Sequence, residues 1–128
     1  MTTNSQINEG IILFAHGSRD PLWCKPIEAI AVTIAKQSPS SVVRCAYLEL
    51  MKPDLETVVA DMMTEYGITH IRIAPMFLGV GVHARQDLPV LVEALRLAHP
   101  RLQLDLMPSI GENPQVIAAI AGALTNRF

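Results

Sequence analysis

Short aliphatic runs alternate with helix-like segments along the whole chain, and this alternation limits the folds open to it. Four runs are rich in apolar and β-branched residues, as strands buried on both faces are. They cover residues 10–15, 41–48, 69–76 and 102–107. Apolar residues recur at helical spacing over residues 21–37 (regular from about Lys25), 53–66, 87–98 and 113–125. Strands separated by helices pair in parallel through right-handed crossovers, so the sequence predicts an α/β fold.

A four-stranded parallel sheet between two layers of helices is the expected arrangement, a flavodoxin-like three-layer sandwich with strand order 2-1-3-4. In this order the winding reverses between the first and third strands, and ligands bind in the crevice that opens there at the carboxyl ends of the strands. The 128 residues suit a single domain. We expect residues 1–9 to form a flexible tail and residues 10–128 to form the domain.

Two histidines and a glutamate follow three of these strands. His16 lies in a turn after the first strand, Glu49 ends the second, and His83 lies in a glycine-containing loop, 77–86, after the third. Asp87 is expected to cap the next helix. Strand-end histidines and carboxylates are often only hydrogen-bonded or solvated. Together at one edge, however, two imidazoles and a carboxylate suit a first-row divalent metal, and histidine accepts protons near neutral pH.

Polar and glycine residues beside the two histidines are candidate substrate contacts: Ser18, Arg19, Gly79, Gly81 and Arg85. The serine can bind a ligand oxygen or cap the following helix. The arginines can pair with carboxylates of a ligand, because a planar guanidinium matches a carboxylate. Both arginines can equally be ordinary surface charges.

Composition excludes several classes of partner. The net charge is −2, so no basic footprint for nucleic acid is present. No apolar run approaches the ~20 residues that span a bilayer, and the first nine residues lack a signal-peptide pattern. Cys24 and Cys45 have no metal-site spacing and are expected to be reduced thiols. We therefore expect a cytoplasmic protein that binds neither nucleic acid nor membrane.

Three segments in this order resemble one family. The turn 15–19, Ala-His-Gly-Ser-Arg, resembles the N-terminal signature of the class II tetrapyrrole chelatases. The stretch 75–83, followed by Asp-Leu-Pro at 87–89, resembles their second signature. The segment 46–49, followed by Pro53, also fits. The best match is the CbiX-like group, which includes sirohydrochlorin cobaltochelatases and ferrochelatases.

This resemblance implies a lyase that inserts Co²⁺, Fe²⁺ or Ni²⁺ into a sirohydrochlorin-type tetrapyrrole without ATP, for cobalamin or sirohaem synthesis. His16 and His83 match the metal ligands and proton acceptors of the family, and Glu49 matches a residue that joins the metal site. The metal is a substrate, and no tightly bound cofactor is implied. Short single-domain members form homodimers. Val80 and Val82 depart from the smaller or more polar residues common in the second signature.

Two other functions compete with this interpretation. A non-catalytic carrier of metal or tetrapyrrole would use the same histidines. A histidine phosphatase also places His-Gly after a strand, but it normally has an arginine directly before the histidine, where this chain has Ala15.

Overall fold

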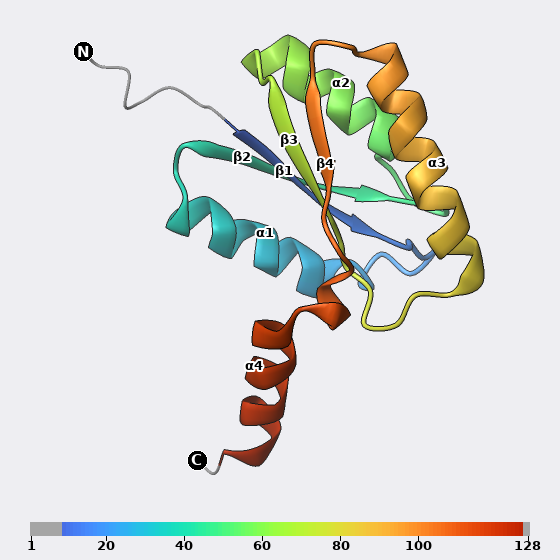
Figure 1. The fold of residues 1–128 in the computed structure, drawn as a ribbon. Coiled ribbons are helices and arrows are strands. Elements are labelled where there is room, and N and C mark those ends of the chain that lie inside the picture. Colours follow the sequence, from blue (N-terminus) through green and yellow to red (C-terminus); the bar gives the residue numbers. More distant parts are fainter. Residues whose placement is uncertain (1–8, 127–128) are drawn as a thin grey trace.

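The sheet has the expected order and direction. The computed structural model describes residues 9–126, and its four strands pair in parallel in the order β2-β1-β3-β4 (Figure 1). The strands are β1 (Glu9–Ala15), β2 (Ser41–Tyr47), β3 (His70–Pro75) and β4 (Gln103–Leu106). β1 and β3 are neighbours, so the winding reverses between them. The expected tail lies outside the described residues except for Glu9, which begins β1 and pairs with Ser41.

The helices cover the two faces of the sheet unequally. They are α1 (Lys25–Gln37), α2 (Leu55–Tyr66), α3 (Val82–Ala98) and α4 (Pro114–Thr125), with a short 3₁₀ turn, η2 (Ile110–Glu112), before α4. α2 and α3 pack on one face over the larger core, whereas α1 alone covers the other (Figure 1). α4 extends away from the sheet (Figure 1). None of these helices is long and apolar enough to cross a membrane.

Local chemistry sets several helix ends, and α2 begins at Leu55, two residues after the start expected from the sequence. Asp54 caps α2, because its Oδ1 accepts a hydrogen bond of 2.9 Å from the Thr57 amide. Gly67 ends α2 in the left-handed conformation at φ +64°. Asn113 caps α4, accepting hydrogen bonds from the amides of Gln115 and Val116.

The start of α3 differs from the expectation. The helix begins at Val82, five residues before Asp87, and Gly81 rather than Asp87 is its N-cap. Pro89 therefore lies inside the helix, where a proline costs about 3 kcal/mol in an isolated helix. Burial of one apolar side of α3 against the sheet offsets this cost; the buried residues are Leu88, Val92 and Leu95. The expected start at Asp87 is therefore wrong, and the helix extends one further turn towards its N-terminus.

The cap of α2 makes stability depend on pH. Hydrogen bonds from Thr57 hold the pKa of Asp54 below its ordinary value of 3.8. A carboxyl group with a lowered pKa stabilises the fold above its unfolded-state pKa, and this stabilisation is lost as the pH falls through the folded-state pKa. We expect Asp54→Ala to lower the free energy of unfolding by about 1 kcal/mol at neutral pH.

Urea unfolding at neutral and acidic pH measures both effects. Asp54→Asn is the matched control, because an asparagine caps the helix without titrating. It should retain stability at neutral pH and lose less stability on acidification than the wild type. Equal destabilisation by alanine and asparagine would contradict the assigned role of the cap.

Candidate functional site

The ends of β1 and β2 continue to pair beyond the strands themselves. The Leu48 amide donates to the carbonyl of Ala15 at 2.9 Å, and the Glu49 amide donates to the carbonyl of His16 at 3.0 Å. This extension carries Glu49 to the turn that follows β1. His16 and Glu49 are far apart in sequence, but this backbone hydrogen bond holds them side by side.

Gly17 allows this close approach. Its φ is +102°, a region that side chains with a Cβ rarely adopt, and a Cβ built there would lie 1.8 Å from the carbonyl oxygen of Glu49. The Ala-His-Gly-Ser-Arg turn therefore requires a glycine at this position. It lets the backbone after His16 contact the backbone at Glu49.

The side chains of His16 and Glu49 form an open pair. The distance from His16 Nε2 to Glu49 Oε2 is 3.7 Å, and the side chains are 52% and 55% exposed. This separation is too long for a direct hydrogen bond, and solvent reaches both groups. An imidazole nitrogen and a carboxylate oxygen this close, and this accessible, can share a divalent ion or a proton.

His83 lies in the first turn of α3 and not in a loop, because the helix begins at Val82. It follows β3, so it belongs to the same carboxyl edge of the sheet as the other two candidates, and it is exposed. Within residues 9–126 no three His, Cys, Asp or Glu side chains gather closely enough to hold a metal. The structure thus brings His16 and Glu49 together and leaves His83 outside that pair.

The two residues after Gly17 differ in their roles. Ser18 Oγ accepts a hydrogen bond of 3.0 Å from the Asp20 amide, so it stabilises the turn itself. It does not cap α1, whose N-cap residue is Cys24. Arg19 is exposed and takes part in none of the ion pairs found in the described part of the chain. Its guanidinium is available to a ligand.

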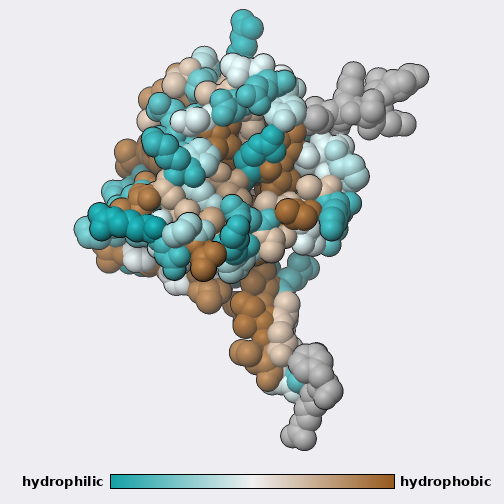
Figure 2. Space-filling model, turned by 180° about the vertical axis from the view of Figure 1, so that it is seen from behind, coloured by the Kyte–Doolittle hydropathy of each residue, from teal (hydrophilic) through white to brown (hydrophobic). Residues whose placement is uncertain are grey.

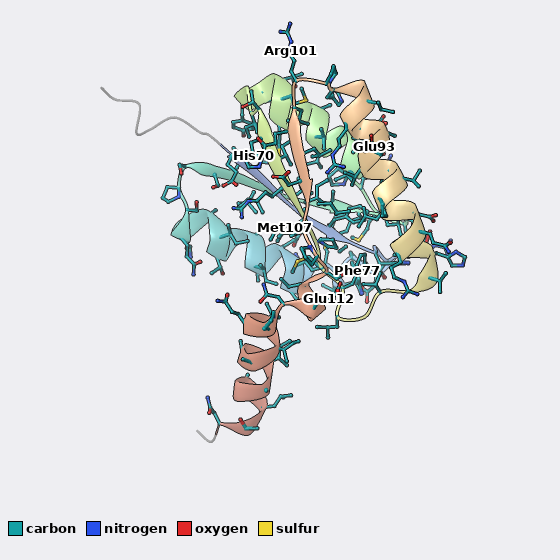
Figure 3. The ribbon with its side chains drawn as sticks, in the orientation of Figure 1. His70, Phe77, Glu93, Arg101, Met107 and Glu112 are labelled. Carbon is teal, nitrogen blue, oxygen red and sulfur yellow. The ribbon has the colours of Figure 1, made fainter. Side chains whose placement is uncertain are left out.

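The second glycine-containing segment borders a small pocket. Gly79 and Gly81 are exposed, and a Cβ at either would meet no atom within 4 Å, so neither is required by close packing. Arg85 lines a pocket of about 170 Å³ at the ends of β3 and β4, with Glu112 on the same lining. Figure 3 shows Phe77, Met107 and Glu112 gathered at this end of the sheet.

Gly111 is a residue that sequence reasoning missed. Its amide donates to the carbonyl of Phe77 at 3.0 Å, and a Cβ there would lie 2.0 Å from the carbonyl oxygen of Leu78. This contact seats η2 against the segment that leads to His83. Gly111 stands alone in the sequence, without a recognisable motif, so no pattern predicted its close contact with the backbone of Leu78.

Comparison with known proteins assigns the family. The family model CbiX matches residues 10–126, nearly the whole described chain. The chain belongs to the CbiX family. The crystal structure of a CbiX protein from Marinobacter aquaeolei superposes with a TM-score of 0.78 at 34% identity, covering 91% of this chain and 93% of that one.

Two curated relatives of this CbiX chain are sirohydrochlorin cobaltochelatases. The sirohydrochlorin cobaltochelatase of Methanococcoides burtonii is 36% identical over 84 residues, 66% of this chain and 63% of the relative. That of Methanosarcina acetivorans is 36% identical over 80 residues, 62% of this chain and 61% of the relative. The matches thus span somewhat less than two thirds of these relatives. The sirohydrochlorin chelatase SirB of Bacillus subtilis shares the fold, with a TM-score of 0.75 over 91% of this chain and 50% of that one.

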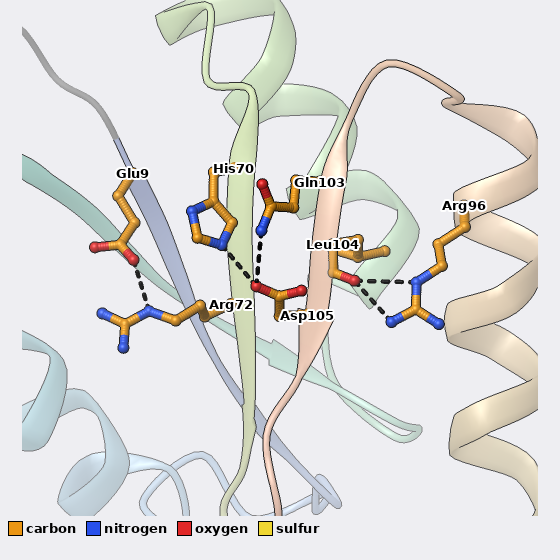
Figure 4. A network of polar contacts seen from close by, with 7 residues as sticks. All are labelled: Glu9, His70, Arg72, Arg96, Gln103, Leu104 and Asp105. Atoms are coloured by element: carbon orange, nitrogen blue, oxygen red, sulfur yellow. Dashed lines mark hydrogen bonds and ion pairs between the residues drawn. The ribbon is translucent and has the colours of Figure 1, made fainter.

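His70 of this CbiX chain lies at the opposite end of the sheet from the pair, at the start of β3. Its Nε2 is 2.7 Å from Asp105 Oδ2, and this hydrogen bond is the main cause that lowers the pKa of Asp105 (Figure 4). The contact joins β3 to β4. His70 therefore has a structural partner.

The two cysteines of this CbiX chain are free thiols, Cys24 at the N-cap of α1 and Cys45 in β2. Cys24, Cys45 and Tyr47 line a hollow of about 470 Å³ along β2. Burial raises the pKa of the Cys45 thiol and of the Tyr47 hydroxyl. The Cys45 thiol and the Tyr47 hydroxyl therefore stay protonated at neutral pH.

Proposed function

We propose that this chain inserts a divalent metal, Co²⁺, Fe²⁺ or Ni²⁺, into a sirohydrochlorin-type tetrapyrrole without ATP. The observation that carries the proposal is the open His16–Glu49 pair at the carboxyl edge of the sheet in a chain of the CbiX family. The names of the relatives support sirohydrochlorin as the substrate. The metal is a substrate of the reaction and is not a resident cofactor.

The pair suits the charge balance of this reaction. Insertion places one M²⁺ on the ring nitrogens and releases two pyrrole N–H protons. We propose that His16 and Glu49 hold the ion first. When the ion passes to the ring, the vacated imidazole nitrogen and carboxylate oxygen accept the two protons. Both side chains are half exposed, so solvent can then remove the protons.

We assign His83 as a third metal ligand or proton acceptor and the neighbouring polar groups to the tetrapyrrole. His83 is exposed at the same edge of the sheet, in the first turn of α3. Arg19 and Arg85 would pair with carboxylates of the macrocycle. The segments around Ser18, and around Gly79 and Gly81, would contact its rim.

We propose the cytoplasm as the compartment, since Cys24 and Cys45 are free thiols. A second copy of the chain is the proposed protein partner, since the His16–Glu49 pair is open to solvent in the single chain. The product would serve cobalamin or sirohaem synthesis.

A spectroscopic assay tests the proposal. Sirohydrochlorin is incubated with Co²⁺, Fe²⁺ or Ni²⁺ under anaerobic conditions, with the protein at one hundredth of the substrate concentration, and the absorption change on metal insertion is followed. We expect many turnovers per chain with at least one of the three metals. A rate equal to that without protein for all three metals would refute the proposal.

The same assay separates an enzyme from a carrier. A carrier binds metal or tetrapyrrole at one equivalent and gives no turnover beyond it. A chelatase converts the whole substrate pool and releases two protons per metal inserted, which a pH indicator in weak buffer records.

A further inference from the structure

A hollow with sulfur-containing side chains on its lining lies between α1 and β2, a strand at the edge of the sheet. Its volume is about 470 Å³. Both cysteines of the chain line it, Cys24 at the N-cap of α1 and Cys45 in β2, and so does Met51, which follows β2. None of the residues described on its lining belongs to α4, the hydrophobic column seen in Figure 2. The function proposed above uses none of these sulfur atoms.

The two thiols lie close to one another. Cys24 and Tyr47 are buried in one cluster with Ala15, and the partly buried Cys45 and Met51 pack against it. Burial is the main cause that raises the pKa of Cys45, and the Cys24 thiol contributes to the same rise. Burial also mainly raises the pKa of the Tyr47 hydroxyl, with contributions from both thiols. Since such effects act at short range, the tyrosine and the two thiols form one group.

Two different elements hold the thiols in place. Cys24 is 6% exposed, and its Sγ donates to the carbonyl of Pro21 at 3.6 Å. Cys45 lies within β2, which pairs with β1 along its whole length. Tyr47 is two residues further along the same strand, so its side chain shares the face of Cys45. Its ring packs against Trp23, with 6.4 Å between the ring centroids. The sulfur atoms are therefore positioned before any ligand binds.

The donor atoms of the hollow select a soft metal ion. Within residues 9–126 no three His, Cys, Asp or Glu side chains gather closely enough to hold a metal, so the hollow lacks a ligand set for Co²⁺ or Ni²⁺. Thiolate and thioether sulfur atoms select Cu⁺ instead. Two thiolates and one thioether are a sufficient ligand set for this ion, and Cys24, Cys45 and Met51 supply them.

We propose that Cys24, Cys45 and Met51 bind one Cu⁺ ion in this hollow, apart from the metal site proposed above. Binding releases two thiol protons to solvent, because a thiol that coordinates a metal ion is deprotonated even where it is protonated in the free protein. The two thiolates and the Cu⁺ ion together carry one negative charge. The thioether adds a third ligand without adding charge.

The charges around the hollow suit this anionic unit. Arg44 and Lys52 line the hollow together with one carboxylate, that of Glu28. The Glu28 carboxylate lies 3.7 Å from Lys25 Nζ, so a positive charge outside the hollow already balances it in part. The lining therefore presents an excess of positive charge to the two thiolates and their ion.

The hollow borders the proposed metal site, and this part of the inference rests on the proposed function. A second pocket, of about 330 Å³, is lined by Glu49 and shares Tyr47, Met51 and Lys52 with the hollow. Among divalent first-row ions, copper binds nitrogen and oxygen ligands most tightly, so it is the strongest competitor for the pair of His16 and Glu49. A copper ion held as Cu⁺ on sulfur cannot occupy that pair. The hollow thus protects metal insertion against copper.

A copper titration tests the site. The reduced wild type is titrated anaerobically with Cu⁺ against bicinchoninate, a coloured chelator of this ion. We expect one Cu⁺ per chain, an ultraviolet thiolate-to-copper absorption band and two protons released into weak buffer. Cys24→Ser and Cys45→Ser should each lose the ion to the chelator with unchanged circular dichroism. Met51→Leu should hold it more weakly than the wild type does.

Two control variants locate the ion. Met63→Leu removes a thioether from α2, where Met63 packs against the main core, and should bind Cu⁺ as the wild type does. His16→Ala should also retain the ion, and its loss there would place copper at the other site and overturn the proposal. A wild type that yields all Cu⁺ to the chelator, or that binds it without releasing protons, would overturn the proposal without reference to any variant. A cysteine variant that retains Cu⁺ like the wild type would overturn it too.

The protective role is scored separately from binding. One equivalent of Cu⁺ should leave Co²⁺ insertion by the wild type unchanged and should slow insertion by Cys24→Ser. Equal inhibition of the two chains would overturn the protective role but not the sulfur site. A chain that binds Cu⁺ on sulfur yet inserts no metal into sirohydrochlorin would overturn the chelatase function but not the sulfur site.

Discussion

Replacing His16 with alanine should lower the rate of metal insertion at least ~100-fold, since a positioned proton-transfer group contributes that much or more. The change removes the imidazole from the pair with Glu49, so the ion loses a ligand and the pyrrole protons lose an acceptor. Stability should be little affected, because the side chain is half exposed and both polar contacts of its ring are long: 3.7 Å to Glu49 and 3.5 Å to the carbonyl oxygen of Gly17. Initial rates of the absorption change, together with thermal unfolding, measure both effects.

A matched histidine variant controls for a nonspecific loss of metal-insertion activity. His99→Ala removes an imidazole at the far end of α3, where His99 follows the last helical residue, and should leave the rate unchanged. Glu49→Gln keeps the size of the side chain but removes its negative charge and its ability to accept a proton, so its rate should fall between wild type and His16→Ala. A His16→Ala enzyme with wild-type turnover, or a His99→Ala enzyme that is equally impaired, would remove the pair from the mechanism.

The strand order and the meeting of His16 with Glu49 could be predicted because both follow from local patterns and one topological rule. Aliphatic runs separated by helical segments give a parallel sheet, and in a parallel sheet all carboxyl ends share an edge. The sequence thus placed two strand-end residues together without knowledge of any contact. The extent of α4 was equally readable, because the expected range 113–125 starts at its cap, Asn113, and a cap acts only on its own helix.

Other features depend on contacts that no local pattern encodes. Asp87 was wrong as the cap of α3, because burial of Leu88, Val92 and Leu95 outweighs the cost of Pro89 within the helix. That shift moves His83 from a loop onto a helix. The position of α4 depends in the same way on the contact between Gly111 and the backbone of Leu78.

Gly17 is the position where a single methyl group should have the largest effect on the fold around the site. In Gly17→Ala the new Cβ would overlap the carbonyl oxygen of Glu49 at 1.8 Å, so one of the two backbone segments must move. The positive φ of +102° adds strain of about 1–3 kcal/mol for a residue with a Cβ. We expect the free energy of unfolding to fall by more than this strain alone, about 3 kcal/mol or more, as measured by urea denaturation.

Gly67→Ala separates the two causes, because Gly67 also has a positive φ, +64°, but a Cβ there would meet no atom within 4 Å. It should therefore cost about 1 kcal/mol, the penalty for the left-handed conformation alone.

The two variants, Gly17→Ala and Gly67→Ala, should also differ in activity. Gly17→Ala must widen the distance between the His16 turn and Glu49, so at a temperature where it is still folded its insertion rate should fall towards that of His16→Ala. Gly67→Ala lies at the far end of α2 and should keep the wild-type rate. Equal losses of stability in the two variants would mean that the backbone at Glu49 moves away from the new Cβ at no cost in free energy. The close contact between Gly17 and Glu49 would then not be what holds His16 beside Glu49.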